Sequence, residues 1–269
     1  MQSSRKQTDD KRKTTSLAED FQLYFDVDLA TTREMQLQTY RTRYRVYCEE
    51  FNYEAADAFP DGLETDEFEA QSLHCLVTHK SSGRAAGCMR LVCVEEQQIL
   101  PMEKFCASVL DRAFIDSLGV PRETFGEFSR LAVDGAFRRR SGENVSRFGA
   151  LTALDCSKRE LRTFSLIAVA TFLAGFAAAD LVGRHNLFAM MEPFLPRMLK
   201  RAGIHAQSAG TPIDYHGLRA PYFTTSEQAL ADIGPELREL YATVHARFSR
   251  QAGLLQARPG GGGIASARV

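Results

Sequence analysis

Residues 164–182 constrain the fold more than any other part of the chain, because they are almost uniformly apolar and close to the length that a bilayer requires. A helix that is apolar on every side is either buried in a protein core or placed in a membrane. Thr171, Asp180 and several alanines interrupt the run, and its far end lacks aromatic anchors. We therefore expect a buried core helix here, with a membrane-spanning or interfacial helix as the alternative.

The rest of the composition suits a soluble enzyme with one core. The chain has 269 residues, 44% hydrophobic and 25% charged, and its formal net charge of -1 argues against a nucleic-acid partner. We expect one domain at residues 21–250, between a disordered tail at residues 1–20 and a disordered glycine-rich tail at residues 251–269. The N-terminus lacks a signal-peptide pattern, and the six cysteines lack zinc-like spacing. These features predict a cytoplasmic protein with reduced core cysteines and no metal site.

Apolar periodicity predicts helices and strands in alternation along the chain. Helices are expected at residues 31–51, 101–118 and 193–202 and from Pro235 to Phe248. Strands are expected at Ser72–His79, residues 85–94, Phe125–Val133 and Asn186–Met191, with two short ones between residues 204 and 223. Thr31 and Glu34 have capping-box spacing, and the acidic residues 52–70 are expected to form an ordered surface loop. This order predicts a single mixed α/β domain.

Seven charged residues lie where a core pattern would place apolar ones. Arg90 falls inside an apolar strand and Arg130 inside Phe125–Val133, while Arg43 shares a helix face with Tyr47. Because burying an unpaired ion costs several kcal/mol, these arginines need carboxylate partners, which the acidic loop offers. The set is Arg43, Glu64, Asp66, Glu69, Arg90, Glu127 and Arg130. We expect a buried ionic cluster, with surface pairs worth about 0 to 1 kcal/mol each as the alternative.

The order of these motifs resembles known acyl-transferring families. Glu-Thr-Asp-Glu-Phe-Glu at residues 64–69, Gly-Cys-Met-Arg-Leu at 87–91 and Glu-Phe-Ser-Arg-Leu-Ala-Val at 127–133 are similar to the signature of acyl-homoserine-lactone synthases and long-chain N-acyl amino acid synthases. Ala-Met-Met-Glu-Pro at 189–193 and Tyr-His-Gly-Leu-Arg-Ala-Pro-Tyr at 215–222 resemble the acyltransferases of exosortase (PEP-CTERM) protein-sorting systems. Several motifs in one order are more specific than any single motif.

The resemblance implies an acetyltransferase-like (GNAT) fold, an α/β domain whose mixed central sheet is flanked by helices. It further implies an N-acyltransferase that moves a fatty acyl group to a small amine or amino acid. The donor would be an acyl-phosphopantetheine thioester on acyl carrier protein or coenzyme A, with no tightly bound cofactor and with room for peripheral membrane contact. Lactone synthases tend to carry a tryptophan after the first helix and a final aspartate in the acidic motif. This chain has no tryptophan and has Glu69, so binding of S-adenosylmethionine is not expected.

Three alternative functions remain open at this point. They are an acyl-homoserine-lactone synthase, an acetyltransferase dependent on coenzyme A, and a non-catalytic module that binds an acyl carrier or lipid. The first two would share the fold and differ in product. The third would keep the binding surfaces and show no turnover.

N-acylation needs a base, because a protonated amine cannot attack a thioester. Glu64 and Glu127 are the candidates, and Glu64 is preferred because a mobile acidic loop could close over the amine, while Glu127 could instead hold Arg90 or Arg130. These four residues form the expected catalytic set. Glu127 and Arg130 can share a cleft only if their strand is bulged or ends there, since residues three apart in a regular strand face opposite ways.

Further residues are expected to bind the substrates. The backbone N–H groups near Ala132 and Val133 are candidates to receive the thioester oxygen. The substrate-binding set is Arg43, Tyr47, Asp66, Glu69, Ser129, Ala132 and Val133. The basic triplet Arg138, Arg139 and Arg140 is expected to grip the phosphopantetheine phosphate or an acidic carrier-protein helix, with plain solvated surface as the alternative. The long apolar helix with Met190, Met191 and Met198 is expected either to line an acyl tunnel or simply to fill the core.

Overall fold

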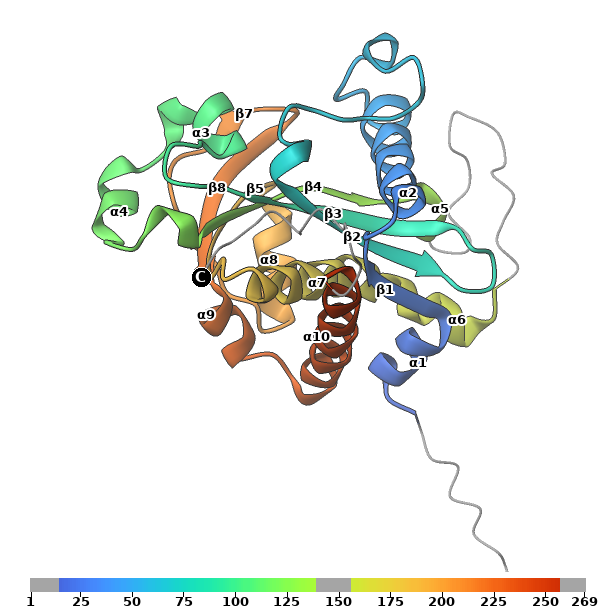
Figure 1. The fold of residues 1–269 in the computed structure, drawn as a ribbon. Coiled ribbons are helices and arrows are strands. Elements are labelled where there is room, and N and C mark those ends of the chain that lie inside the picture. The colour runs from blue at the N-terminus through green and yellow to red at the C-terminus, as the bar shows by residue number, and fades with distance from the viewer. Residues whose placement is uncertain (1–14, 139–155, 257–269) are drawn as a thin grey trace, which may run out of the picture.

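The computed structural model describes residues 15–138 and 156–256. An eight-stranded mixed sheet runs through the middle of the molecule in the order β1-β2-β3-β4-β5-β8-β6, with β7 paired to β8 (Figure 1). The strands are β1 Phe25–Leu29, β2 Ser72–His79, β3 Ala85–Cys93, β4 Phe125–Val133, β5 Asn186–Met191, β6 Gln207–Ser208, β7 Ile213–Asp214 and β8 Leu218–Thr225. The pairing of β4 with β5 is parallel and the others are antiparallel. The predicted mixed sheet is confirmed.

Helices cover both faces of this sheet. Figure 1 shows α2 above one face, and α7 and α10 below the other. The helices are α1 Leu17–Tyr24, α2 Arg33–Tyr44, α3 Pro101–Phe105, α4 Arg112–Ser117, α5 Gly135–Arg138, α6 Lys158–Thr163, α7 Ile167–Leu181, α8 Phe194–Arg201, α9 Ser226–Ala231 and α10 Pro235–Gln256. Helices on both faces of one mixed sheet make an α/β domain, as the sequence predicted.

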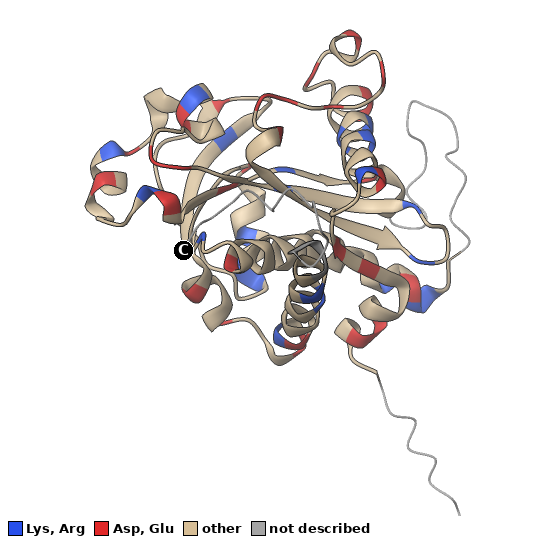
Figure 2. Cartoon of the chain, in the orientation of Figure 1, with Lys and Arg blue, Asp and Glu red and all other residues tan. Residues whose placement is uncertain are grey.

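The long apolar helix α7 lies under the centre of the sheet. The ring of Phe176 in α7 packs edge-on against Phe128 of β4. Gly175 lets α7 approach β3 closely, because a Cβ at this position would lie 2.1 Å from the Met89 side chain. Lys158–Leu181 is the one stretch of the described residues long and apolar enough to cross a membrane, but 72% of its most apolar window is buried inside the protein. Figure 2 accordingly shows α7 with few charges. The prediction of a core helix is confirmed.

Several predicted boundaries need correction. Residues 17–20, expected in the N-terminal tail, belong to α1. A capping box between Ser16 and Glu19 starts this helix, and the buried side chain of Phe21 packs it against the core. The strand β1 that follows was not predicted. At the other end α10 continues to Gln256, beyond the expected limit at residue 250.

The first and second predicted helices also differ in detail. Thr32, rather than Thr31, caps α2 by accepting a hydrogen bond from Met35 N–H, and the helix continues as a π-helix at Arg45–Glu50. The helix expected at residues 101–118 is broken at Cys106, whose backbone leaves the helical region, and Asp111 then caps α4. The cysteines behave as expected where described: none is in a disulfide, and all but the half-buried Cys156 are buried.

The arrangement of β4 positions the site. Its parallel pairing with β5 ends at Phe128 opposite Ala189, although β4 continues to Val133, so the two strands separate there. On its other edge β4 is bulged: Arg90 of β3 pairs with Ser129, and Cys88 pairs with Ala132, so two β4 residues oppose Met89. The separation and the bulge open space beside β4 in the middle of the sheet.

Candidate active site

The predicted ionic cluster forms, and its innermost member is Glu64. This side chain is fully buried, and both of its carboxylate oxygens are occupied: Arg43 Nε donates to Oε2, and Arg130 Nε donates to Oε1 at 2.9 Å. Arg130 also lies 3.2 Å from a carboxylate oxygen of Asp66. Helix α2 and strand β4 supply the two arginines, and the loop between α2 and β2 supplies the carboxylates.

Arg90 of β3 holds the rest of the acidic loop. Its Nη1 lies 2.5 Å from Asp66 Oδ1 and 2.9 Å from Glu69 Oε1, and Arg43 Nη2 lies 2.8 Å from the same Glu69 oxygen. His74, which the sequence analysis did not single out, lies 3.0 Å from the other Glu69 oxygen. We call Arg43, Arg90, Arg130, Glu64, Asp66 and Glu69 the ionic cluster. The alternative of loose surface pairs is excluded for these residues.

The arginines keep these carboxylates ionised. Burial alone would raise the pKa of Glu64, but the charges of Arg43 and Arg130 outweigh burial and lower that pKa below its ordinary value. The pKa values of Asp66 and Glu69 are lowered in the same way, against the opposing effect of burial. A carboxylate with a lowered pKa is a weak proton acceptor, and Glu64 has no exposed surface. The structure thus places Glu64 inside the protein between two arginines, and its role as the base stays a prediction.

Glu127 is an equally buried carboxyl group in a different setting. It is 2% exposed and accepts a hydrogen bond from Met102 N–H at 2.8 Å. Among the described residues it has no ion-pair partner, so it does not hold Arg90 or Arg130. Burial raises the pKa of Glu127 to about 8, although the Met102 hydrogen bond opposes the shift. This is the only one of the predicted carboxylates whose pKa is raised.

Glu127 and Arg130 face a common cavity because β4 is bulged, which is the geometry that the sequence required for them to share a cleft. Arg130 sits in the bulge of β4 with a φ of 53°, a left-handed conformation that is rare for residues other than glycine. Glu127, Ser129 and Arg130 consequently line one small cavity of about 40 Å³. Ser129 also accepts a hydrogen bond from Arg90 Nε at 3.0 Å, which links this cavity to the ionic cluster.

A second, much larger cavity of about 890 Å³ shares a wall with the small one. Tyr47, Phe128, Ser129, Arg130, Met190 and Arg219 line both. The large cavity extends along the separated β4 and β5 to α6, α7 and α8. Its lining is mostly apolar and includes the predicted Met190, Met191 and Met198, together with Ala168 and Phe172 of α7. These methionines and two residues of the long helix border a cavity, while most of α7 fills the core, and the acyl-tunnel role stays a prediction.

The backbone of β4 offers one donor to the large cavity. Asp134 N–H donates to Ala86 C=O, and Ala132 pairs with Cys88 in the same antiparallel ladder, so the Ala132 N–H points toward β3. The next N–H, that of Val133, must point the other way, into the space that β5 has left. Val133 lines the large cavity and the buried Ala132 does not. Of the two predicted backbone donors, only Val133 is therefore available.

Tyr47 and Arg138 border the same space. The Tyr47 hydroxyl donates to Leu131 C=O at 2.8 Å, and burial raises the pKa of Tyr47 to about 12, so the hydroxyl stays protonated. Arg138 lines the large cavity, pairs with Glu50, and its Nε donates to Val133 C=O at 2.7 Å. Arg139 and Arg140, predicted beside it, lie outside the described residues.

The sequence analysis missed some of the walls of the small cavity. Arg219 of β8 lines both cavities, and its buried Nε has no hydrogen-bond partner among the described residues. Met102, Cys106 and Tyr215 also line the small cavity. Arg219 carried a signal as a charge within β8, and both it and Tyr215 fall in the quoted stretch 215–222. Met102 in α3 and Cys106 at its end reach the cavity through the path of that helix, which no local pattern indicates.

Comparisons with known proteins agree with this fold. Residues 42–146 match the family described as acetyltransferase (GNAT) domain. TofI in a ternary complex with an inhibitor and MTA is 18% identical, with a TM-score of 0.55 over 80% of this chain and 99% of that one. The AHL synthase LasI is 15% identical, with a TM-score of 0.51 over 78% and 97% of the chains. No curated protein matches.

A further solved structure is that of the CoA-dependent acyl-homoserine lactone synthase BjaI with SAM and isopentyl-CoA. It is 18% identical, with a TM-score of 0.51 over 83% of this chain and 88% of that one. At identities this low, structural similarity establishes the fold alone. The chain thus has the acetyltransferase-type α/β fold of these synthases, and the family match on that fold indicates an acyltransferase.

Proposed function

We propose that this protein transfers a fatty acyl group from a phosphopantetheine thioester to a small amine or amino acid. The observation that carries the proposal is Glu127, a buried carboxyl group with a pKa of about 8 in the wall of a small polar cavity that shares Ser129 and Arg130 with a large apolar one. A pKa near the working pH suits a general base, because the group can both accept and return a proton.

The chemistry follows from the two cavities. The amine occupies the small cavity in its neutral form, and its nitrogen attacks the thioester carbon at the mouth of the large cavity while giving one proton to the Glu127 carboxylate. A C–N bond forms, the C–S bond breaks, and the proton held by Glu127 returns to the departing thiolate. The negative oxygen of the tetrahedral intermediate is received by Val133 N–H. Met102 N–H fixes the orientation of the base throughout.

Glu64 takes a structural role in this proposal. With Arg43 and Arg130 on its two oxygens, it holds the helix α2 against β4 and fixes the bulge. The bulge in turn directs Arg130 toward the small cavity. Arg90, Asp66 and Glu69 support the same arrangement from the side of β3. The ionic cluster therefore positions the site without exchanging protons in it.

The size of the large cavity favours a long acyl group. About 890 Å³ is at the upper end of ordinary ligand pockets and exceeds what an acetyl group needs. Unbranched methionine side chains adapt to a flexible chain. Arg138 at its rim would meet the phosphopantetheine phosphate of acyl carrier protein or coenzyme A. Such donors are expected in the cytoplasm, and the stretches that resemble exosortase-system acyltransferases support the same class of acyl transfer.

The test is a donor and acceptor matrix. Purified protein is mixed with acyl-carrier-protein and coenzyme A thioesters from acetyl to palmitoyl, together with a panel of amines and amino acids. Released thiol and product mass are measured. We expect thiol release that requires an amine, grows with acyl length, and yields an N-acyl product.

The control is Glu123→Gln, which removes an exposed carboxylate near β4 and leaves both cavities intact. Absence of thiol release with every donor and acceptor would overturn the proposal and favour a non-catalytic binding module. Formation of an acyl lactone from S-adenosylmethionine would also overturn it, in favour of a lactone synthase.

A further inference from the structure

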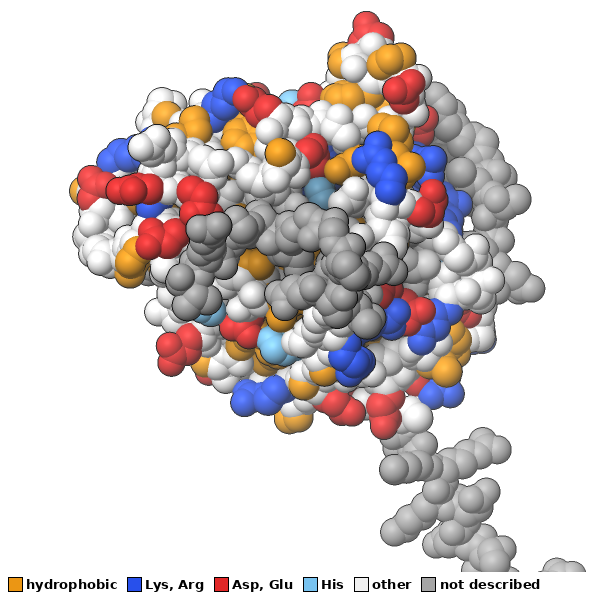
Figure 3. Space-filling model, in the orientation of Figure 1, with side chains coloured by type: hydrophobic (Ala, Val, Ile, Leu, Met, Phe, Trp, Pro, Cys, Tyr) orange, Lys and Arg blue, Asp and Glu red, His pale blue; other side chains and the backbone are white. Residues whose placement is uncertain are grey.

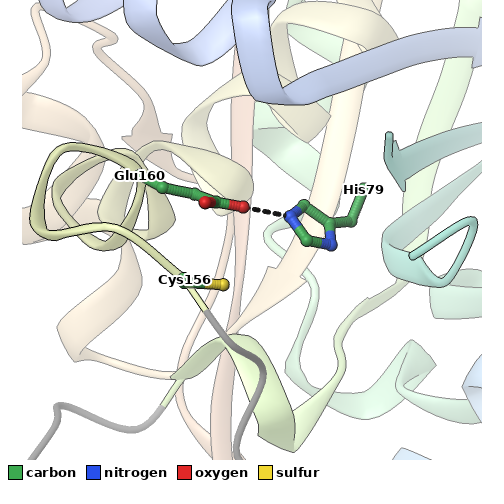
Figure 4. A group of neighbouring side chains, drawn as sticks. All are labelled: His79, Cys156 and Glu160. Carbon is green, nitrogen blue, oxygen red and sulfur yellow. Dashed lines mark hydrogen bonds and ion pairs between the residues drawn. The ribbon is translucent and has the colours of Figure 1, made fainter. Parts of the chain in front are cut away.

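A group of metal-ligating side chains lies apart from both cavities. His79 ends strand β2, Glu160 lies in the first turn of α6, and Cys156 comes two residues before that helix begins. His79 and Glu160 are buried and Cys156 is half-buried. Figure 4 shows the three side chains directed into a common space. None of them lines either cavity.

Their distances suit one small cation. One ligand atom from each residue lies within 4.8 Å of the other two, and His79 Nε2 is 2.5 Å from Glu160 Oε1. In a tetrahedral zinc site, bonds of about 2.0 to 2.3 Å put neighbouring ligand atoms about 3.4 to 3.6 Å apart. Binding would therefore replace the hydrogen bond between His79 and Glu160 with two metal bonds, after a shift of about 1 Å.

The ligands are held by outer hydrogen bonds. Ser82 Oγ lies 2.8 Å from His79 Nδ1, which leaves Nε2 as the nitrogen that faces the group. Ser157 N–H donates to Glu160 Oε2 at 3.3 Å and fixes the second carboxylate oxygen. The histidine ring also packs against Phe25 and Phe137. Outer partners of this kind set ring orientation and basicity in metal sites.

The donor set selects the class of metal. Imidazole nitrogen, thiolate sulfur and carboxylate oxygen together suit zinc and its cobalt substitute, whereas magnesium and calcium prefer oxygen ligands only. Cys156 would lose its proton on binding, and with Glu160 it would balance the charge of a divalent ion. A water molecule would supply the fourth position.

We propose that His79, Cys156 and Glu160 bind one zinc ion. The site would fasten α6 to the end of β2. Helix α6 carries Leu161 and Arg162, which line the large cavity, so the metal would fix one wall of that cavity. The proposal is independent of the acyl-transfer reaction and concerns metal binding alone.

The experiment measures metal binding to the full chain. Protein stripped with chelator and kept in a non-chelating reductant is titrated with zinc, and with cobalt as a spectroscopic probe. We expect one equivalent of zinc per chain, a rise in Tm on zinc addition, and a thiolate-to-cobalt charge-transfer band. Cys156→Ala should abolish the band, and Ser82→Ala should weaken zinc binding by about 10- to 100-fold.

Cys93→Ala is the matched control, because it removes a cysteine that belongs neither to the three ligands nor to the lining of either cavity. It should bind zinc like the wild type. His79→Gln tests a second ligand. If that variant does not fold, the result of Cys156→Ala decides between the two outcomes, because Cys156 is only half-buried and its replacement should not unfold the protein. Failure of the wild type to bind one equivalent, or equal binding by wild type and Cys156→Ala, would overturn the proposal.

Discussion

Glu127 of β4 and Glu64, which pairs with Arg130 of the same strand, are both buried glutamates, but they differ in counter-ions and pKa. Glu64 is enclosed by Arg43 and Arg130, and its pKa is lowered. Glu127 has a single backbone donor and a pKa raised to about 8. Burial is common to both, so burial alone does not make a base. The counter-ions decide which carboxylate can exchange a proton at neutral pH.

The two surroundings also differ in what they do for stability. Removing one partner from a buried ion pair leaves an unpaired charge and is strongly destabilising. Burying a carboxyl group without a counter-ion costs free energy, so replacing such a group should not lower the stability of the fold. We therefore expect stability to depend on Glu64 and activity to depend on Glu127.

The largest expected effect is that of Glu127→Gln on turnover. Loss of a general base lowers kcat by about 10²- to 10⁴-fold, while Gln can still accept the Met102 hydrogen bond and the fold is kept. Steady-state thiol release and thermal unfolding measure the two quantities. A variant that keeps more than a tenth of wild-type kcat would remove Glu127 from the base role.

Glu64→Gln should act on the fold. The change leaves Arg43 and Arg130 without a full counter-charge and lowers the free energy of unfolding by about 3 to 5 kcal/mol. Urea unfolding measures it. Glu34→Gln, which alters an exposed pair with Arg41, is the control and should change little. A stable Glu64→Gln protein with no activity would instead support the base role first expected for Glu64.

The pH dependence of stability should separate the two groups. The folded pKa of Glu127, about 8, lies above an unfolded value near 4.3, so the folded state binds the extra proton between these values. This stability is complete below the unfolded pKa and declines by about 1.4 kcal/mol per pH unit as pH rises toward 8.

Glu64 has the opposite sign. Its lowered pKa gives stability that is present above the unfolded value and lost as pH falls through the folded one. Glu127→Gln should remove only the decline between about pH 4.3 and pH 8, in urea unfolding followed from pH 4 to 9. An unchanged decline in that variant would show that another group causes it.

The smallest expected effect is that of Arg138→Ala. The pair of Arg138 with Glu50 is partly exposed and contributes at most about 1 kcal/mol to stability. Its position at the rim of the large cavity predicts a several-fold rise in KM for the thioester donor with kcat little changed. Arg41→Ala, at an exposed pair, should leave KM unaltered. A fall in kcat without a change in KM would place Arg138 elsewhere in the mechanism.

Much of this division could be predicted from the sequence. Arginines inside apolar strands implied carboxylate partners, and the hydrophobic pattern gave the hairpin, β4, β5 and the buried α7. The identity of the base could not be predicted, because it depends on which oxygens the arginines occupy. Arg219 and Met102 reach the site through the paths of β8 and α3, and the bulge at Arg130 depends on the register with β3, none of which a local pattern specifies.

The central claim is that Glu127 titrates near neutral pH, and carboxyl NMR tests it directly. The protein is labelled with ¹³C at glutamate side chains and titrated in the wild type and in Glu127→Gln. One carboxyl signal should have its midpoint near pH 8 and be missing from the variant. If every glutamate of the wild type titrates in the ordinary acidic range, Glu127 is an ionised carboxylate like Glu64, and the account fails.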